Sequence, residues 1–231
     1  MSEIDIFIEY FFEDEGYKNF LDGLTNTAII AVSGLLIGIL LGSILAIVKI
    51  IPSKNPIVVI CQKLCDVYIA LFRGTPMVVQ LLLMHFALFP MLGLNIESVA
   101  EACLIFGLNS AAYISEIMRG GINAVDKGQM EAGRSMGFGY TQTMIRIILP
   151  QAIKNILPTL GNEFIALIKE TSVVNFIAVM DITKSFQAVA ASTYEYFVPY
   201  IVLAIVYLVL VLMITWLVHF MERRLSKSDR K

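Results

Sequence analysis

Charged residues are scarce in this chain of 231 residues: they make up 16% of it, while hydrophobic residues make up 58%. A soluble domain of this size would carry about a quarter charged residues. So much apolar surface requires a solvent other than water. The composition therefore excludes an ordinary soluble domain and indicates a protein that lies in a lipid bilayer.

Side chains that bind metals or perform catalysis are also few, with two His and three Cys. Cys61 and Cys65 lie on one helical face, but a zinc site needs two further ligands and none is near them in the sequence. Ordinary thiols buried in the membrane, Cys103 among them, are the better interpretation. No His cluster, Ser/Lys dyad or metal motif occurs in the apolar segments, which argues against an intramembrane enzyme.

Two more absences concern partners and cofactors. The net charge of −2 suggests no nucleic-acid partner. The phosphate-binding pattern G-x-x-x-x-G-K-[ST] does not occur, so no cofactor is expected in this chain. Any ATP must therefore be bound by a separate chain.

Long apolar stretches predict an all-α membrane protein with five transmembrane helices in a single domain, residues 1–231. Residues 23–48 and 198–218 carry no charge over 26 and 21 positions, and a helix crosses a bilayer with about 20 apolar residues. The five spans are expected at about 22–50, 57–91, 98–118, 156–179 and 195–220.

The second span is too long for one crossing, and Phe72-Arg73-Gly74-Thr75-Pro76 interrupts it. Pro76 has no backbone donor and Gly74 adds conformational freedom, so we expect a kink or break there. We treat residues 61–89 as one crossing with a bend near its cytoplasmic third. For Arg73, a structural role is favoured over lining a pathway.

Basic residues predict the orientation of the spans. The first nineteen residues carry six carboxylates and one Lys, and residues 89–101 carry no basic residue. The segment after the first span and the connection 119–155 are rich in Lys and Arg. The tail adds Arg223, Arg224, Lys227, Arg230 and Lys231. By the positive-inside rule the N-terminus lies outside and the C-terminus lies in the cytoplasm.

The N-terminal segment 1–19 combines acidic residues with apolar ones at helical spacing. The apolar residues are Ile4, Phe7, Ile8, Phe11 and Phe12. This pattern predicts a short helix lying in the outer membrane interface, with a frayed acidic tail as the alternative.

Small residues form a stripe along the first span. They recur every four residues, at Gly34, Gly38, Gly42 and Ala46. Such a stripe lets another helix approach closely, so it predicts helix packing and says nothing of a substrate.

The connection 119–155 has a helical pattern of its own. Residues 129–136 favour a short helix that Gly137 and Gly139 end, and Thr141 is a candidate N-cap for a second one running to about Leu149. Two short helices joined by a glycine elbow would make a compact, water-facing knob. The alternative is a solvated connector, but 37 residues are long for one.

Part of this connection resembles the cytoplasmic coupling loop of ABC importer permeases, the "EAA" loop. Glu131-Ala132-Gly133 is followed after three residues by Gly137, and after nine more by Ile147-x-Leu149-Pro150. Gly133 stands where this family more often has Ala. The resemblance implies a type I ABC importer fold in a bacterial cytoplasmic membrane. It also implies that these residues couple the permease to an ATPase subunit, which binds the ATP and Mg²⁺.

Other stretches resemble the polar amino-acid branch of these permeases. They are Phe72-Arg73-Gly74-Thr75-Pro76 with Gln80, Asn109-Ser110-Ala111-Ala112-Tyr113 leading to Glu116 and Arg119, and Gly161-Asn162-Glu163 leading to Lys169-Glu170-Thr171-Ser172. The resemblance runs from the second span to the fourth, and the outer segments agree in hydropathy only. It implies an importer for a polar amino acid, of the histidine, glutamine or arginine type.

Ionisable residues inside the spans are the candidates for substrate contact. Glu163, Lys169 and Glu170 lie in the fourth span, where a charge costs several kcal/mol unless it is paired or hydrated. Asn109, Tyr113 and Glu116 share one face of the third. Because a free amino acid carries both charges, we expect it to contact Glu163 and Asn109 first. Lys169 and Glu170 are the next candidates for substrate contact, together with Gln80 and Tyr113. A structural ion pair between Lys169 and Glu170 is the equal alternative.

The sequence thus predicts a transmembrane subunit of an ATP-driven importer. The expected partners are ABC ATPase subunits, a second permease copy or a related permease, an external substrate-binding protein and membrane lipid. A transporter driven by an ion gradient would explain the buried carboxylates but not the coupling loop, and no internal repeat is visible.

Overall fold

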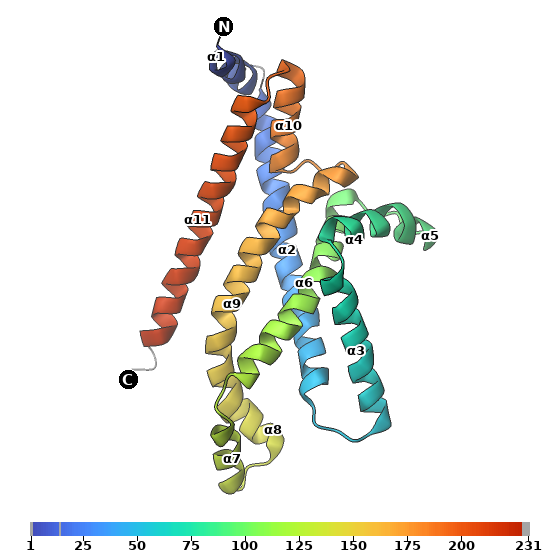
Figure 1. Ribbon diagram of the computed structural model, residues 1–231, viewed down its shortest axis with the longest axis vertical. Coiled ribbons are helices and arrows are strands. Elements are labelled where there is room, and N and C mark those ends of the chain that lie inside the picture. Colours follow the sequence, from blue (N-terminus) through green and yellow to red (C-terminus); the bar gives the residue numbers. More distant parts are fainter. Residues whose placement is uncertain (1, 14, 228–231) are drawn as a thin grey trace.

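The computed structural model describes residues 2–13 and 15–227, and every element assigned there is helical (Figure 1). Asp14, Arg230 and Lys231, which contributed to the predicted orientation, lie outside the described residues. The helices are α1 (Glu3–Ile8), α2 (Gly16–Ile50), α3 (Pro56–Gly74), α4 (Met77–Leu83), α5 (Phe89–Met91), α6 (Ser98–Asn123), α7 (Lys127–Ser135), α8 (Tyr140–Thr143), α9 (Leu149–Glu170), α10 (Ile182–Thr193) and α11 (Phe197–Lys227). Shorter π-helical or 3₁₀ turns (Glu9–Glu13, Met84–Leu88, Met144–Ile148 and Thr171–Ile177) adjoin them.

Long helices form the body of the molecule, with short helices at its two ends and α4 and α5 at one side between them (Figure 1). We call the end that holds α7 and α8 the coupling end, and the end that holds α1 and α10 the N-terminal end. Helices α2, α6, α9 and α11 run between these ends, and α3 runs beside α2 and α6 (Figure 1).

The small-residue stripe of α2 packs against α6, as the sequence predicts. A Cβ atom on Gly34 would lie 3.1 Å from Phe106 Cβ, and one on Gly38 would lie 2.8 Å from Ser110 Cβ. One on Gly42 would lie 2.9 Å from the carbonyl oxygen of Ala111. Such close approach gives the two helices dense van der Waals contact, which is the main attraction available between helices in lipid.

The predicted break in the second span is confirmed. The axes of Pro56–Gly74 and Met77–Met91 differ by 107°. Helix α3 has 19 residues before the break and is about 28 Å long, close to the thickness of a bilayer core. The sharp turn therefore sends α4 and α5 sideways, and α5 projects from the side of the molecule (Figure 1).

The fourth predicted span differs most from its expected bounds. Helix α9 begins at Leu149, directly after a π-helical turn, and ends at Glu170, with Pro158 inside it. By length and apolarity, three helices among the described residues could cross a membrane, or up to four if the bent pair is one span. Helix α9 is not among them, because polar residues interrupt its apolar pattern.

The N-terminal end is held together by aromatic side chains. Phe7, Phe11 and Phe20 surround Phe186 of α10, with ring centroids 6.5, 6.2 and 5.8 Å from it. The predicted short helix therefore exists as α1 and the π-helical turn after it, and part of its apolar side packs on protein. Helix α10 itself lies between the fourth and fifth predicted spans, where no helix was expected.

The coupling end contains the two predicted short helices. Helix α7 ends at Ser135, Gly137 follows it with a φ of +87°, and the amide of Phe138 donates to the carbonyl of Gly133 at 3.1 Å. This six-residue closure is a Schellman motif, which requires a residue such as Gly in the left-handed region. The expected N-cap Thr141 is wrong, since Gly139 caps α8. The second helix also does not stop at Leu149 but continues into α9.

Candidate functional site

Glu163 lies on α9, facing α6 across the middle of the bundle. Its Oε1 accepts a hydrogen bond of 2.9 Å from the hydroxyl of Ser110, and the side chain is half-buried. No Lys, Arg or His among the described residues lies within 4.0 Å of this carboxylate. The hydrogen-bond partner of this carboxylate is thus neutral, and the charge of Arg73 acts on it only from beyond ion-pair distance.

Asn109 and Gln80 contact each other and are almost fully buried, with 4% and 5% of their surface exposed. Asn109 Nδ2 donates to Gln80 Oε1 at 2.8 Å, and Gln80 Nε2 lies 2.8 Å from the carbonyl oxygen of Phe72. In an unbroken helix that carbonyl would accept from residue 76, but Pro76 has no N–H group. Gln80 therefore supplies the donor that the helix break removes.

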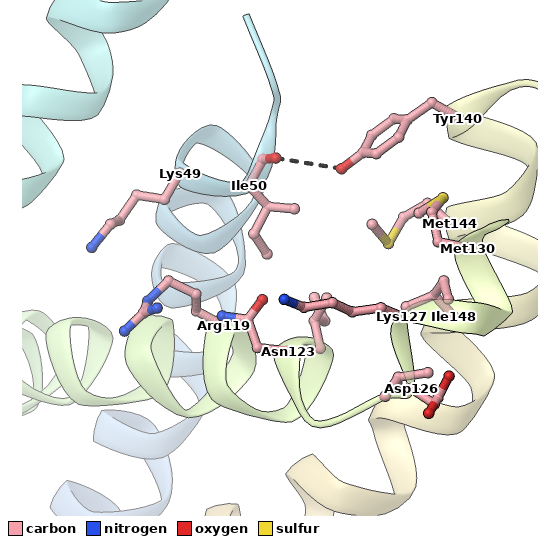
Figure 2. A pocket seen from close by; sticks show the side chains of 12 residues that line it. Lys49, Ile50, Arg119, Asn123, Asp126, Lys127, Met130, Tyr140, Met144 and Ile148 are labelled. Atoms are coloured by element: carbon pink, nitrogen blue, oxygen red, sulfur yellow. Dashed lines mark hydrogen bonds between the residues drawn. The ribbon is translucent and has the colours of Figure 1, made fainter.

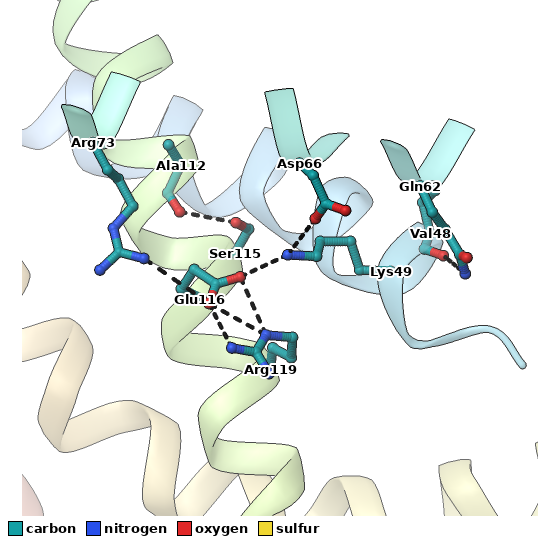
Figure 3. Close-up of polar contacts among 9 residues, drawn as sticks. All are labelled: Val48, Lys49, Gln62, Asp66, Arg73, Ala112, Ser115, Glu116 and Arg119. Atoms are coloured by element: carbon teal, nitrogen blue, oxygen red, sulfur yellow. Dashed lines mark hydrogen bonds and ion pairs between the residues drawn. The ribbon is translucent and has the colours of Figure 1, made fainter. Parts of the chain in front are cut away.

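Glu116 is the centre of a network of charges that joins three helices (Figure 3). Its carboxylate accepts from Lys49 of α2 at 2.9 Å and from Arg119 at 2.6 Å, and Arg73 of α3 lies 3.9 Å away. Lys49 also pairs with Asp66 at 3.0 Å. Since two carboxylates balance most of the charge of three cations, this network binds α2, α3 and α6 together near the coupling end.

The remaining polar candidates occupy different surroundings. Arg73 lies over the ring of Tyr113, 5.3 Å from its centroid, which agrees with the favoured structural role of Arg73. Lys169 is exposed and Glu170 is half-buried, at the end of α9. They form no ion pair shorter than 4.0 Å with each other, so the structural pair weighed above is absent here.

One residue had no expected partner in the sequence and has one in the structure. His85 Nδ1 lies 2.6 Å from Oε2 of Glu101, whose side chain is buried at the start of α6. His85, for which the sequence indicates no partner, therefore pairs with a carboxylate across the helix break. Sixteen residues and a helix break separate the two, so no local spacing rule could have joined them.

The coupling knob, residues 127–148, is built around Gly133. A Cβ atom on this Gly would lie 2.5 Å from Cγ2 of Thr143 and 3.0 Å from Cδ1 of Ile147. Gly133 therefore packs α7 against the second coupling helix and is buried between them. Glu131 and Ala132, next to it, are exposed.

The motif residues beyond the knob lie at the start of α9. Leu149 is half-buried, and Pro150 lies where α9 continues from the π-helical turn Met144–Ile148. Tyr140 ties the knob to the end of α2, because its hydroxyl donates to the carbonyl of Ile50 at 3.4 Å. Burial raises the pKa of this hydroxyl above its ordinary value.

A cleft of about 680 Å³ lies between the knob and the ends of α2 and α6 (Figure 2). Its polar lining includes Lys49, Arg119, Asn123, Asp126 and Lys127, and its floor is apolar. Three of these side chains are cationic and one is anionic. The cleft lies at the coupling end, and neither Glu163 nor its partner Ser110 lines it.

Residues 34–227 match the family described as binding-protein-dependent transport system inner membrane component. This chain belongs to that family. The match covers four of the five predicted spans in full and the whole coupling loop, so the chain is a permease component of the inner membrane.

Two curated relatives cover nearly the whole chain. The arginine transport system permease protein ArtQ of Bacillus subtilis is 42% identical over 90% of this chain and 93% of its own length. The putative glutamine transport system permease protein GlnP of Rickettsia bellii is 40% identical over 90% of this chain and 93% of its own. The predicted resemblance to the amino-acid branch of ABC permeases is confirmed.

Two solved structures share the fold. A crystal structure described as an amino acid ABC transporter with histidines superposes with a TM-score of 0.84 and 39% identity, covering 93% of this chain and 98% of the other. An inward-facing MetNI methionine ABC transporter gives a TM-score of 0.71 at 17% identity, covering 97% of this chain and 99% of the other. The second likeness concerns the fold alone.

Proposed function

We propose that this chain is the membrane-spanning subunit of an ATP-driven importer that carries a polar amino acid into the cell. The main support for this proposal is the exposed coupling knob. A compact pair of helices outside the apolar bundle is explained by a partner subunit that binds it, and a transporter without such a subunit would not need it. Relatives described as arginine and glutamine permeases support the substrate class.

In this proposal the chain crosses the membrane five times, through α2, the bent α3–α5 segment, α6, α9 and α11. The N-terminus lies outside and the C-terminus lies in the cytoplasm, as the basic residues predict. Helix α9 carries too many polar residues for a lipid-facing span. That composition fits a helix that lines the route of the substrate.

ABC ATPase subunits, which bind the ATP and Mg²⁺, would dock on the exposed side of α7 through Glu131 and Ala132. Gly133 and Ile147 fix the shape of the knob by close packing, and Gly137 fixes it by its left-handed backbone conformation. Leu149 and Pro150 then pass its movement into α9, because the second coupling helix and α9 are continuous. A push on the knob would tilt α9 directly.

Two further partners complete the proposed complex. Helix α11 is almost entirely exposed along its apolar length, so it has room for lipid and for a second permease copy or a related permease. An external substrate-binding protein would deliver the amino acid at the N-terminal end.

For the substrate, Glu163 is our first choice of contact, since its carboxylate lacks a cation that the ammonium group of an amino acid would supply. Lys169, Glu170 and Tyr113 are further candidates along the same route. Asn109 and Gln80 remain candidates only if their mutual hydrogen bond opens during transport, because both are buried in this conformation.

A charge reversal on the knob tests the proposal. We expect Glu131→Arg to abolish co-purification of the ATPase and ATP-driven uptake, whereas Glu9→Arg, an exposed reversal at the other end of the molecule, should leave co-purification of the ATPase unchanged. Normal uptake by Glu131→Arg, or uptake that follows a proton or sodium gradient without ATP, would contradict the proposal.

A further inference from the structure

The cleft at the coupling end has an apolar extension that the proposed transport route does not use. A groove of about 360 Å³ adjoins it, lined by Ile47, Ile50, Ile51, Ile122, Tyr140, Thr141, Met144, Ile145 and Leu149. Four of these residues, Ile50, Ile122, Tyr140 and Met144, line the cleft as well. The cleft, which we call the charged compartment, and the groove, which we call the apolar compartment, therefore adjoin along these four residues.

The charged compartment favours an anion. Lys127 faces into the cleft and reaches toward Asn123, whereas the carboxylate of Asp126 points away from it (Figure 2). Asp126 Oδ1 accepts from the amide of Gly128 at 2.7 Å and so is engaged by its own helix. Lys127 makes no ion pair with any described residue. The Lys127 ammonium thus lies in the cleft without an ion-pair partner, and Asn123 and Tyr140 add polar groups to the same lining.

The apolar compartment favours hydrocarbon. Ile47, Ile51 and Ile145 are 61%, 43% and 58% exposed, although they lie where α2 leaves the bundle and the knob begins. Side chains of this kind gain about 25 cal/mol for each Å² that they bury. One amphipathic molecule with a negatively charged head would fill both compartments together.

We propose that this cleft and groove bind one anionic phospholipid of the cytoplasmic leaflet. Its phosphate would lie between Lys127, Asn123 and Arg119, and an acyl chain would lie along Ile47, Ile51 and Ile145. The proposal rests on the proposed orientation, which puts the coupling end at the cytoplasmic surface, where basic pockets beside transmembrane helices bind anionic headgroups. The lipid would then contact α2, α6 and the knob at once.

The test uses the purified full-length chain with its co-expressed partners, in mixed detergent micelles containing a fluorescent phosphatidylglycerol. We expect Lys127→Gln to weaken binding of this lipid about fivefold, since one charge near a membrane surface contributes about 1 kcal/mol. Lys54→Gln is the matched control, because Lys54 is exposed at the same end but lines neither compartment. Lys127→Arg should bind the phosphatidylglycerol as well as the unchanged protein does. That result would show that replacing the side chain at this position does not by itself disrupt the site.

Two arms separate a lipid from a free anion. Ile145→Ser, at an exposed groove position, should weaken phosphatidylglycerol binding, and inorganic phosphate should displace the lipid only poorly. Equal binding by Lys127→Gln and Lys54→Gln would overturn the proposal. So would full displacement by inorganic phosphate together with normal binding by Ile145→Ser, which would identify a free-anion site.

Co-purification of the ATPase is recorded in the same samples. Lipid binding without the ATPase would count against the proposed function alone, and the ATPase without selective lipid binding would count against the lipid site alone.

Discussion

Two carboxylates inside the bundle, Glu116 and Glu163, have opposite surroundings. Glu116 lies within 4.0 Å of Lys49, Arg73 and Arg119, whereas Glu163 accepts one hydrogen bond from Ser110. The first carboxylate is balanced by its own chain and serves to hold helices together. The second forms no ion pair within 4.0 Å in its own chain, and in the proposed function it is the group that contacts the ammonium group of the substrate.

Neutralising Glu163 should have the largest effect on transport. We expect Glu163→Gln to reduce uptake at least tenfold, because a hydrogen bond to a charged group contributes about 1.5–3 kcal/mol. Membrane insertion and ATPase co-purification should stay normal, since the carboxylate supports no ion pair in the protein. Uptake of a labelled amino acid by reconstituted vesicles measures this, and unchanged kinetics would remove Glu163 from the route.

Neutralising Glu116 should act on stability instead. Glu116→Gln leaves Lys49 and Arg119 without their shared partner, and we expect a loss of about 2–4 kcal/mol in the free energy of unfolding. Asp66→Asn is the matched control, because Asp66 is 61% exposed and its pair with Lys49 should contribute about 1 kcal/mol or less. Thermal unfolding in detergent compares the two. Equal losses would mean that the network does not depend on Glu116.

A neutral pair in the same region extends the comparison. Gln80→Leu removes the donor that serves the carbonyl of Phe72 and the acceptor that serves Asn109, so we expect a loss of about 1–3 kcal/mol. Gln187→Leu, on an exposed side chain, should change stability by about 0.5 kcal/mol at most. If both variants unfold alike, the helix break does not need its side-chain cap.

The smallest expected effect is in the coupling knob, where packing and propensity oppose each other. Gly133→Ala gains about 1 kcal/mol in helix propensity but forces its Cβ to within 2.5 Å of Thr143 Cγ2. We expect a net loss of about 1 kcal/mol or less, since overpacking costs about 1–3 kcal/mol. Adding Thr143→Ser removes the obstructing methyl group and should restore stability. A stable single variant would show that the two coupling helices separate easily.

Local patterns predicted much of the fold. The stripe from Gly34 to Ala46, the break at Pro76 and the glycine elbow at Gly137 each follow from backbone chemistry within a few residues, and the structure has all three. Asp181 could also have indicated α10, since its side chain accepts from the amides of Thr183 and Lys184 as an N-cap does. The apolar pattern predicted spans at 156–179 and 195–220 and no helix in the short connection between them, where α10 lies.

Contacts between distant residues could not be read in this way. The pairs His85–Glu101 and Asn109–Gln80 depend on the 107° turn of the second span, which no spacing rule gives. The network around Glu116 joins three helices and likewise needs their arrangement. For the same reason Asn109 and Glu163 could not be distinguished from the sequence as substrate contacts. In the structure Asn109 donates to Gln80, whereas Glu163 accepts from Ser110.

Equilibrium binding of a labelled amino acid to the purified complex tests the contrast between the two carboxylates most directly. The account predicts that Glu163→Gln weakens binding at least tenfold while the stability of the complex is unchanged, and that Asp66→Asn leaves binding intact. Undiminished binding by Glu163→Gln would contradict it.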